Sequence, residues 1–300
     1  MPAGRQGRRA QVYKLGIAVF VAIFGDMTPG ARWARAGTAV AALLLVSAGL
    51  ASAQFGRGVR FGVRFAPPDL PDRGFTICRI MYTSVRREAD GAGWQTDYPL
   101  GDNNVLIRLG ELTRTRISQD ARRQPNHWVV RLTDDALFNC PYAVASDVGT
   151  MGLSGVEVER LRAYLLKGGF LWVDDFWGTA AWEHWSRVIG EVLPGRPIED
   201  VPLTDPIFQS QFAMKSVPQV PRYPFWVATG GQTSERGEDS RVPHFRAIRD
   251  DHGRIMVVMT HNTDIADSWE REAEEPAYFQ RFSVTGYALA VDVLLYAQTH

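Results

Sequence analysis

The stretch 164–177 (YLLKGGFLWVDDFW) constrains the fold most, because it joins the end of a helix directly to a buried strand. Gly168 is expected to end the helix, since glycine adopts the left-handed conformation of a helix C-terminus at low cost. The apolar run 170–173 is typical of a strand that is covered on both faces. Asp174 and Asp175 follow at its carboxyl end, where open α/β sheets place their ligands. We therefore expect a covered sheet with a site at this edge.

Predicted strands and helices alternate along the rest of the chain, which is typical of an α/β fold. Strands are expected at 75–82, 128–132, 142–145, 245–249 and 254–260, and helices at 103–112, 154–167, 179–190 and 282–297. The sequence therefore predicts an α/β three-layer sandwich with a mainly parallel sheet and helices on both faces.

Local signals predict where two of the helices begin and which faces they bury. Ser154 with Glu157 three residues later matches a capping box at the start of the helix 154–167. Asp102 or Asn103 is expected to cap the N-terminus of the helix 103–112. Apolar residues at helical spacing predict the buried faces, which are Val105, Leu106, Leu109 and Leu112 in one helix and Val156, Leu161, Tyr164 and Leu165 in the other.

The sequence pattern of residues 1–53 predicts that the protein is exported from the cytoplasm. A basic segment precedes an apolar run at 38–50, and Ala-Ser-Ala at 51–53 fits the small-residue rule of signal peptidase. An uncleaved anchor, or a membrane hairpin formed with the upstream apolar run 15–25, is the alternative. A complete signal begins at Met27, so we expect translation to start there. The protein would then be periplasmic, or anchored in the membrane and facing the periplasm.

Composition divides the rest of the chain into a linker and one domain. Residues 54–74 are rich in Gly, Arg and Pro and predict a tether, with an edge strand packed on the domain as the alternative. The α/β domain is expected at 75–300, with an irregular Pro-rich insertion at 194–224.

The charge distribution argues against nucleic acid as a partner. The chain has 33 basic and 33 acidic residues, but six of the basic residues and one acid lie within 1–53. The remainder therefore carries an excess of acids, and it shows no Lys/Arg stripe with interleaved aromatics. No phosphate-binding or dinucleotide-binding glycine motif follows a strand, and we predict no cofactor.

The segment 94–104 combines aromatic rings with oxygen-bearing side chains. Trp94 and Tyr98 offer ring faces, and Asp97, Asp102 and Asn104 offer carboxylate and amide oxygens. This combination is suited to holding a sugar or another polyol. Alternatively, Asp97 and Asp102 could close turns around the neighbouring proline and glycine.

Asp174 and Asp175 are the second candidate site. Adjacent side chains of a strand point to opposite faces, so we expect one of the two to face the crevice. There it could bind a ligand or metal, or act as an acid or base. Capping is the alternative, in which Asp175 would accept N–H groups of the following helix.

His261, Asn262 and Asp264 follow the last predicted strand, which should bring them towards Asp174. His261 with Asp174 or Asp264 could ligate a divalent metal, but the chain has no HxH or HExxH spacing, and we predict no metal site. The alternative is a histidine that is hydrogen-bonded to a carboxylate for structural reasons.

Neither cysteine occupies the turn after a strand where a nucleophile would be expected. Cys78 lies within the first predicted strand and Cys140 just before another, and no G-x-S-x-G motif is present. We expect both cysteines to be buried free thiols, with a disulfide as the alternative in an exported protein.

Several short motifs together point to a known family. They are Arg79-x-x-Tyr82, Trp94-x-Thr-Asp-Tyr-Pro99, Asp102-x-Asn104, Arg108-Leu109, Leu161-x-x-Tyr-Leu-x-x-Gly-Gly-Phe-Leu-x-x-Asp-Asp175 and His261-Asn262-x-Asp264. From Phe75 onwards the chain resembles the bacterial domain of unknown function 4159 family. That family is similar to the class I glutamine amidotransferase-like superfamily, which implies a flavodoxin-like sandwich with a crevice over the strand ends. Amidotransferases use a cysteine at a strand-to-helix elbow, which this chain lacks, and the resemblance implies no established activity.

From the sequence we expect an exported, non-catalytic domain of the cell envelope that binds a carbohydrate, another envelope ligand or a protein partner. The alternative is a hydrolase, with or without a metal, that acts on a sugar or envelope polymer through Asp174 or Asp175 and His261.

Overall fold

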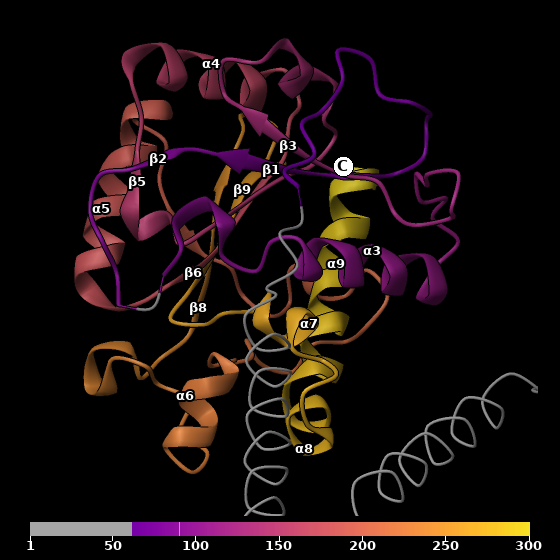
Figure 1. Ribbon diagram of the computed structural model, residues 1–300. Helices are drawn as coiled ribbons and strands as arrows, with labels where there is room; N and C mark the ends of the chain where they lie inside the picture. The colour runs from indigo at the N-terminus through magenta and orange to yellow at the C-terminus, as the bar shows by residue number, and fades with distance from the viewer. Residues whose placement is uncertain (1–61, 90) are drawn as a thin grey trace, which may run out of the picture. The chain divides into compact units, whose positions relative to one another are not determined.

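The computed structural model describes residues 62–89 and 91–300, in which helices cover a seven-stranded sheet (Figure 1). The sheet order is β3-β1-β4-β6-β9-β8-β7. Its strands are β1 (Ile77–Met81), β3 (His127–Arg131), β4 (Ala143–Ser146), β6 (Leu171–Phe176), β7 (Glu199–Asp200), β8 (His244–Arg249) and β9 (Ile255–His261). The first five strands in this order run parallel, and β8 and β7 extend the sheet antiparallel. The predicted α/β sandwich with a mainly parallel sheet is confirmed.

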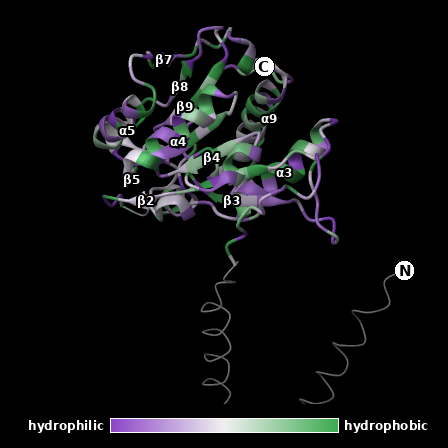
Figure 2. Cartoon of the chain, turned by 90° about the horizontal axis from the view of Figure 1, so that it is seen from above, coloured by the Kyte–Doolittle hydropathy of each residue, from purple (hydrophilic) through white to green (hydrophobic). Residues whose placement is uncertain are grey.

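Helices pack on both faces of the sheet (Figure 2). One face is covered by α3 (Leu100–Leu112), α7 (Asp267–Glu270) and α9 (Val284–Thr299), and the other by α4 (Gly155–Leu166) and α5 (Gly178–Val192). The strand β6 shows why both layers are needed, since Trp172 packs with the first group and Leu171 and Val173 with the second. The described residues also form two short helices, α6 (Tyr223–Ala228) and α8 (Pro276–Tyr278), and a small second sheet of β2 (Thr83–Ser84) and β5 (Met151–Gly152).

The parallel strands have a flavodoxin-like order. Counted along the chain, β1, β3, β4, β6 and β9 lie in the order 2-1-3-4-5. The chain passes to one side of β1 to form β3 and to the other side to form β4. Ligands of such sheets bind outside the carboxyl ends of the strands near this switch point.

The carboxyl ends of three neighbouring strands carry residues with a left-handed backbone. Asp147 after β4, Asp175 in β6 and Asn262 after β9 have φ angles of 53°, 53° and 61°. Asp175 lies within β6, which continues to Phe176 through a register shift against β9, so the strand is longer than the predicted run 170–173. For a residue other than glycine this conformation costs on the order of 1–3 kcal/mol and is concentrated at functional sites.

The prediction of free thiols was wrong, because Cys78 and Cys140 form a disulfide with their Cα atoms 5.9 Å apart. Cys78 lies in β1, and Cys140 lies in the turn before the adjacent strand β4. A position outside the ladder lets Cys140 approach Cys78 from the turn, so the bridge does not have to span two paired strand residues.

The predicted N-terminal cap is confirmed for α4 and was wrong for α3. Ser154 and Glu157 form the predicted capping box of α4. In contrast, α3 begins at Leu100 with Pro99 at its N-cap, and neither Asp102 nor Asn103 caps it. Leu112 and Val156 were wrongly predicted to be buried and are 45% and 60% exposed, since each lies in a terminal turn of its helix.

The structure describes only part of the predicted linker. The backbones of Arg64 and Ala66 hydrogen-bond to Val129 of β3, so this part of 54–74 pairs with the sheet edge, as in the alternative to a tether. The export segment 1–53 and the predicted start at Met27 lie outside the described residues. Among the helices of the described ranges, none has the length and apolarity needed to cross a bilayer.

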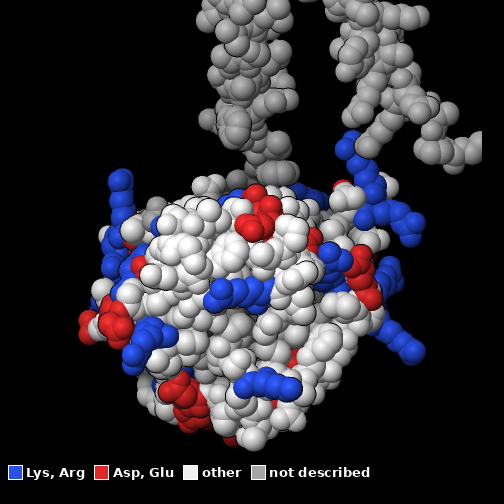
Figure 3. Space-filling model, turned by 90° about the horizontal axis from the view of Figure 1, so that it is seen from below, with Lys and Arg blue, Asp and Glu red and all other residues white. Residues whose placement is uncertain are grey.

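Charged side chains of both signs are scattered over the face seen from below (Figure 3). On this face Lys and Arg form no continuous stripe, and uncharged surface separates most of them.

Candidate functional site

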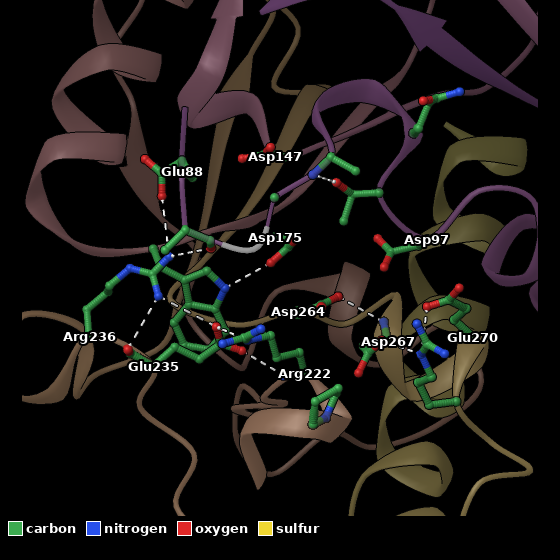
Figure 4. Close-up of a pocket in the computed structure, with 18 residues that line it drawn as sticks. Glu88, Asp97, Asp147, Asp175, Arg222, Glu235, Arg236, Asp264, Asp267 and Glu270 are labelled. Carbon is green, nitrogen blue, oxygen red and sulfur yellow. Dashed lines mark hydrogen bonds and ion pairs between the residues drawn. The ribbon is translucent and has the colours of Figure 1, made fainter. Parts of the chain in front are cut away.

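A cavity of about 280 Å³ lies at the carboxyl ends of the parallel strands, and we call it the carboxyl-edge pocket (Figure 4). Its walls come from the loops that follow β2 and β4, from β6, and from the segments 222–236 and 264–271 around α6 and α7. Eight carboxyl groups and three guanidinium groups line it. They are Glu88, Asp97, Asp147, Asp175, Glu235, Asp264, Asp267 and Glu270, with Arg222, Arg236 and Arg271.

The arginines pair with only some of these acids. At one end of the pocket, Arg236 lies 3.7 Å from both Glu88 and Glu235 (Figure 4). At the other end, Arg271 lies 2.9 Å from Glu270 and 3.3 Å from Asp267. Because the acids outnumber the arginines, the lining is strongly negative when all carboxyl groups are ionised.

Asp97, Asp264 and Asp267 form a compact acidic group in the pocket. One carboxylate oxygen from each lies within 4.8 Å of the other two, and all three residues are buried. Three elements bring them together, since Asp97 precedes α3, Asp264 follows β9, and Asp267 begins α7. We call this group the aspartate trio.

Hydrogen bonds fix the orientation of the trio. Ser146 Oγ donates to Asp97 Oδ2 at 3.0 Å, and the backbone N–H of Asp267 donates to Asp264 Oδ1 at 2.8 Å. The backbone N–H of Tyr223 donates to Asp267 Oδ2 at 2.6 Å. Converging carboxylate oxygens are the ligands that Mg²⁺ and Ca²⁺ prefer, so these three residues could hold a divalent cation.

Burial and mutual repulsion raise the pKa values of the acidic lining. Burial raises the pKa of Asp97 and of Asp264 well above the ordinary value, and Glu270 and Asp175, respectively, add repulsion. Burial also raises the pKa of Glu270 to about 7 and that of Asp147 to about 6. The pocket therefore favours either bound protons or a positively charged group that replaces them.

A buried ion pair is connected to the aspartate trio through Ser146. Arg79 makes two contacts with Asp102 and donates through Nη1 to Thr96 O at 2.9 Å and to Ser146 Oγ at 3.0 Å. Ser146 in turn orients Asp97. Asp102 thus lies beneath the pocket, where its partner is Arg79.

The structure divides the ten predicted site residues into two groups. Asp97, Asp175 and Asp264 line the carboxyl-edge pocket. Asp175 accepts from the Trp177 indole at 2.9 Å, whereas the N–H of Gly178 at the start of α5 bonds to Asn262 Oδ1 at 2.8 Å, so Asn262 takes the capping role considered for Asp175.

The remaining predicted residues make contacts elsewhere. Asp174 turns away from the pocket, accepting from Thr260 Oγ1 at 2.5 Å and from the Ala266 N–H at 2.8 Å. Asn104 donates to the Trp269 carbonyl at 2.8 Å. The rings of Trp94 and Tyr98 pack together with their centroids 5.7 Å apart.

His261 belongs to an aromatic cluster at the antiparallel side of the sheet. Its ring lies 5.0 Å from Phe176, 5.2 Å from Trp182 and 5.7 Å from His244. Its Nε2 lies 3.1 Å from Gly178 O, and its Nδ1 lies 3.3 Å from Arg246 Nη1. Burial lowers its pKa to about 4, so the ring is neutral at physiological pH. His261 is not among the residues that line the pocket.

Several residues that line the pocket were not predicted from the sequence. Asp147 lies two residues after a predicted strand, and Asp267 and Glu270 have the i, i+3 spacing of one helix face, so these three had a detectable signal. Glu235 and Arg236 come from an irregular segment, and their sequence gives no periodic pattern that could place them.

Comparison with known proteins identifies a family. A family model described as "Domain of unknown function (DUF4159)" matches residues 76–298. No curated protein matches the chain. The match covers most of the chain and the whole of the described sheet, and the chain therefore belongs to the DUF4159 family.

Proposed function

We propose that this protein is an exported ligand-binding domain of the cell envelope whose carboxyl-edge pocket takes its ligand together with a divalent cation. The observation that carries the proposal is the convergence of Asp97, Asp264 and Asp267, with one carboxylate oxygen from each within 4.8 Å of the others. A cation would offset their repulsion and leave coordination positions for hydroxyl or carboxyl oxygens of a carbohydrate or another envelope ligand.

Export is supported by two independent features. The basic and apolar pattern of residues 1–53 is that of a signal segment. The Cys78–Cys140 disulfide fits an oxidising compartment, since such bonds are rare in the reducing cytosol.

Cation binding is tested by thermal unfolding and calorimetry of the purified protein with Mg²⁺, Mn²⁺ and Ca²⁺ after treatment with a chelator. We expect at least one of these ions to raise the Tm, and Asp264→Asn to weaken its binding at least about ten-fold, since the trio loses one anionic ligand. Asp135→Asn is the matched control, because the Asp135 side chain is 98% exposed outside the pocket. No Tm shift with any of the ions, or equal binding by Asp264→Asn, would contradict the proposal.

Ligand binding is tested separately by adding sugars and peptidoglycan fragments with and without the effective ion. Binding that requires the ion and is lost in Asp264→Asn is the expected result. A ligand that binds equally well in the presence of chelator would remove the cation from the proposal and leave the pocket as the site.

A metal-assisted hydrolase acting on a sugar or envelope polymer is the second candidate. It is favoured by Glu270, whose carboxyl group lines the pocket near Asp267 and has a pKa of about 7, suited to general acid or base work. Glu270→Gln should then abolish turnover of such a polymer while the cation remains bound. Absence of turnover by the ion-loaded protein would leave the binding function alone.

A further inference from the structure

Residues 113–125, between α3 and β3, form a hairpin that we call the arginine hairpin. The Asp120 N–H donates to Gln124 O and the Arg123 N–H donates to Asp120 O, both at 2.9 Å, so two backbone hydrogen bonds close its turn. Gln119 and Pro125 pair as an antiparallel bridge next to the turn. The turn therefore has a defined shape.

The arginine hairpin is held against the rest of the domain. The Phe75 N–H donates to Arg116 O at 2.7 Å, and the Ser118 N–H donates to Phe75 O at 2.9 Å. A Cβ atom at Gly110 of α3 would lie only 2.9 Å from Ile117 Cγ1, so α3 packs directly on the hairpin. The hairpin therefore presents its side chains from a fixed base.

The arginine hairpin carries four exposed guanidinium groups and a single acid. The exposed groups belong to Arg114, Arg116, Arg122 and Arg123. Among the described residues, no acid forms an ion pair with any of the four. Asp120, the single acid, accepts the backbone N–H groups of Arg122 and Gln124, both at 2.9 Å. The hairpin therefore presents an excess of positive charge to the solvent.

A groove of about 550 Å³ lies between α3 and the arginine hairpin. Arg116 and Arg123 line it from the hairpin, and Ile107, which is 39% exposed, lines it from α3. Glu111 also lines the groove, but its carboxylate lies 2.7 Å from Arg108. The groove thus combines apolar surface with guanidinium groups.

The described chain enters the domain beside the arginine hairpin. Arg64 Nη2 donates to Asn126 Oδ1 at 2.8 Å, and Arg64 Nη1 donates to Pro125 O at 3.5 Å. The predicted export segment is therefore linked to the domain on the side of the hairpin. The residues 54–61 that make this link contain two arginines and no acid, so like charge disfavours them as occupants of the groove.

We propose that the arginine hairpin and the adjoining groove dock on an anionic phospholipid surface of the cell envelope. Guanidinium groups pair well with phosphate oxygens, and clusters of basic residues are attracted to anionic lipid headgroups. Arg114 and Arg122 do not line the groove, so the positive charge extends beyond it. A membrane, which offers many headgroups side by side, matches such an extended surface better than one acidic peptide seated in the groove.

The hairpin differs from a surface for nucleic acid, because residues 113–125 include no aromatic side chain on which bases could stack. The inference rests on the proposed export, which brings the domain to an envelope membrane. It does not depend on what the carboxyl-edge pocket binds.

Sedimentation of the purified protein with lipid vesicles tests the proposal. We expect stronger binding to vesicles of equal parts phosphatidylglycerol and phosphatidylcholine than to vesicles of phosphatidylcholine alone, and added salt should weaken it. Arg116→Gln combined with Arg122→Gln should weaken binding to the anionic vesicles at least about ten-fold, since each arginine near an anionic surface strengthens binding about five-fold.

Arg87→Gln combined with Arg187→Gln is the matched control. Both residues are exposed, and the pair removes the same charge from other parts of the surface, after β2 and in α5 on the opposite face of the sheet from α3. The control should bind the anionic vesicles as the unmodified protein does. Any contribution of the export segment is the same in both double variants.

Hydrogen exchange of the unmodified protein gives a second readout that does not depend on a variant folding. The backbone N–H groups of 113–125 should exchange more slowly on the anionic vesicles than on phosphatidylcholine vesicles, and those of α5 should not change. Equal binding by the two double variants, no slowing at 113–125, or the same slowing with soluble polyglutamate or inorganic phosphate in place of lipid would overturn the proposal. None of these measurements uses a divalent cation or a sugar, so their failure is distinct from failure of the function proposed for the pocket.

Discussion

Arg79 and Asp102 form a two-point ion pair within the core, with Nε 2.9 Å from Oδ2 and Nη2 2.5 Å from Oδ1. Their side chains are only 2% and 3% exposed. Arg79 also donates to Ser146, which donates to Asp97, so one chain of hydrogen bonds joins this pair to the lining of the pocket. The pair is thus placed to support both the stability of the sheet edge and the orientation of Asp97.

Asp102→Asn should strongly destabilise the protein. The substitution leaves the Arg79 guanidinium buried without its counter-charge, which typically costs about 3–5 kcal/mol of unfolding free energy. Urea denaturation measures the loss. Glu111→Gln is the control, since the Arg108–Glu111 pair lies at the surface and contributes about 1 kcal/mol or less. Equal losses of unfolding free energy in the two variants would show that the buried pair contributes no more to stability than the surface pair.

Stability without divalent cations should decrease as the pH rises from about 4 to about 7. A carboxyl group whose pKa is higher in the folded than in the unfolded protein binds more protons when folded, so its favourable contribution is present at low pH. That contribution is lost as the pH rises through the folded pKa values, which are about 6 for Asp147 and Asp174 and about 7 for Glu270. Chemical denaturation in chelator at pH 4.5, 6 and 7.5 measures this trend.

Addition of the effective cation should reduce the loss of stability with rising pH, because the cation stabilises the ionised carboxylates of the trio. Asp264→Asn in chelator should also reduce it, since one repelling group is removed. A free energy of unfolding that rises steadily over the same pH range would contradict the assignment of raised pKa values to the pocket.

The disulfide should make a measurable contribution to stability. It closes a loop with a sequence separation of 62 residues, and bridges of this kind typically contribute about 2–4 kcal/mol. The double variant Cys78→Ala, Cys140→Ala should therefore unfold at lower denaturant concentration. Thiol titration of the denatured, unreduced protein should find no free thiol. Two titratable thiols in protein prepared under oxidising conditions would contradict the bridge.

His261→Gln should leave cation binding unchanged. The ring packs in the aromatic cluster with Phe176 and Trp182 and does not line the pocket, so its loss should affect stability alone. Calorimetry with the effective ion measures the affinity, and NMR of the imidazole should show a neutral ring at pH 6, as its lowered pKa of about 4 requires. Loss of cation binding in His261→Gln would contradict this prediction and show that His261 contributes to the cation site.

Periodic patterns in the sequence were sufficient to predict the fold. The strand predicted at 170–173 and the capping box at Ser154 depend on neighbours within a few residues, and both occur, although the strand continues beyond the predicted run to Phe176. Two of the errors concern residues whose partner is distant in sequence. Asp102 was predicted to cap a helix because its ion pair with Arg79 depends on the tertiary fold. Cys140 was predicted to be a free thiol because only the order of the strands places it next to Cys78.

The sequence by itself determined the alternation of strands and helices, and it identified the carboxyl edge as the place where polar side chains collect. It also placed Asp97, Asp175 and Asp264 among the candidates. Only the tertiary structure decided which of these residues share a cavity, because a one-residue change in strand register or a left-handed turn such as that at Asp175 redirects a side chain completely. Strand alternation predicted that one of Asp174 and Asp175 would face the crevice, and the tertiary structure decided that Asp175 lines the pocket while Asp174 faces the core.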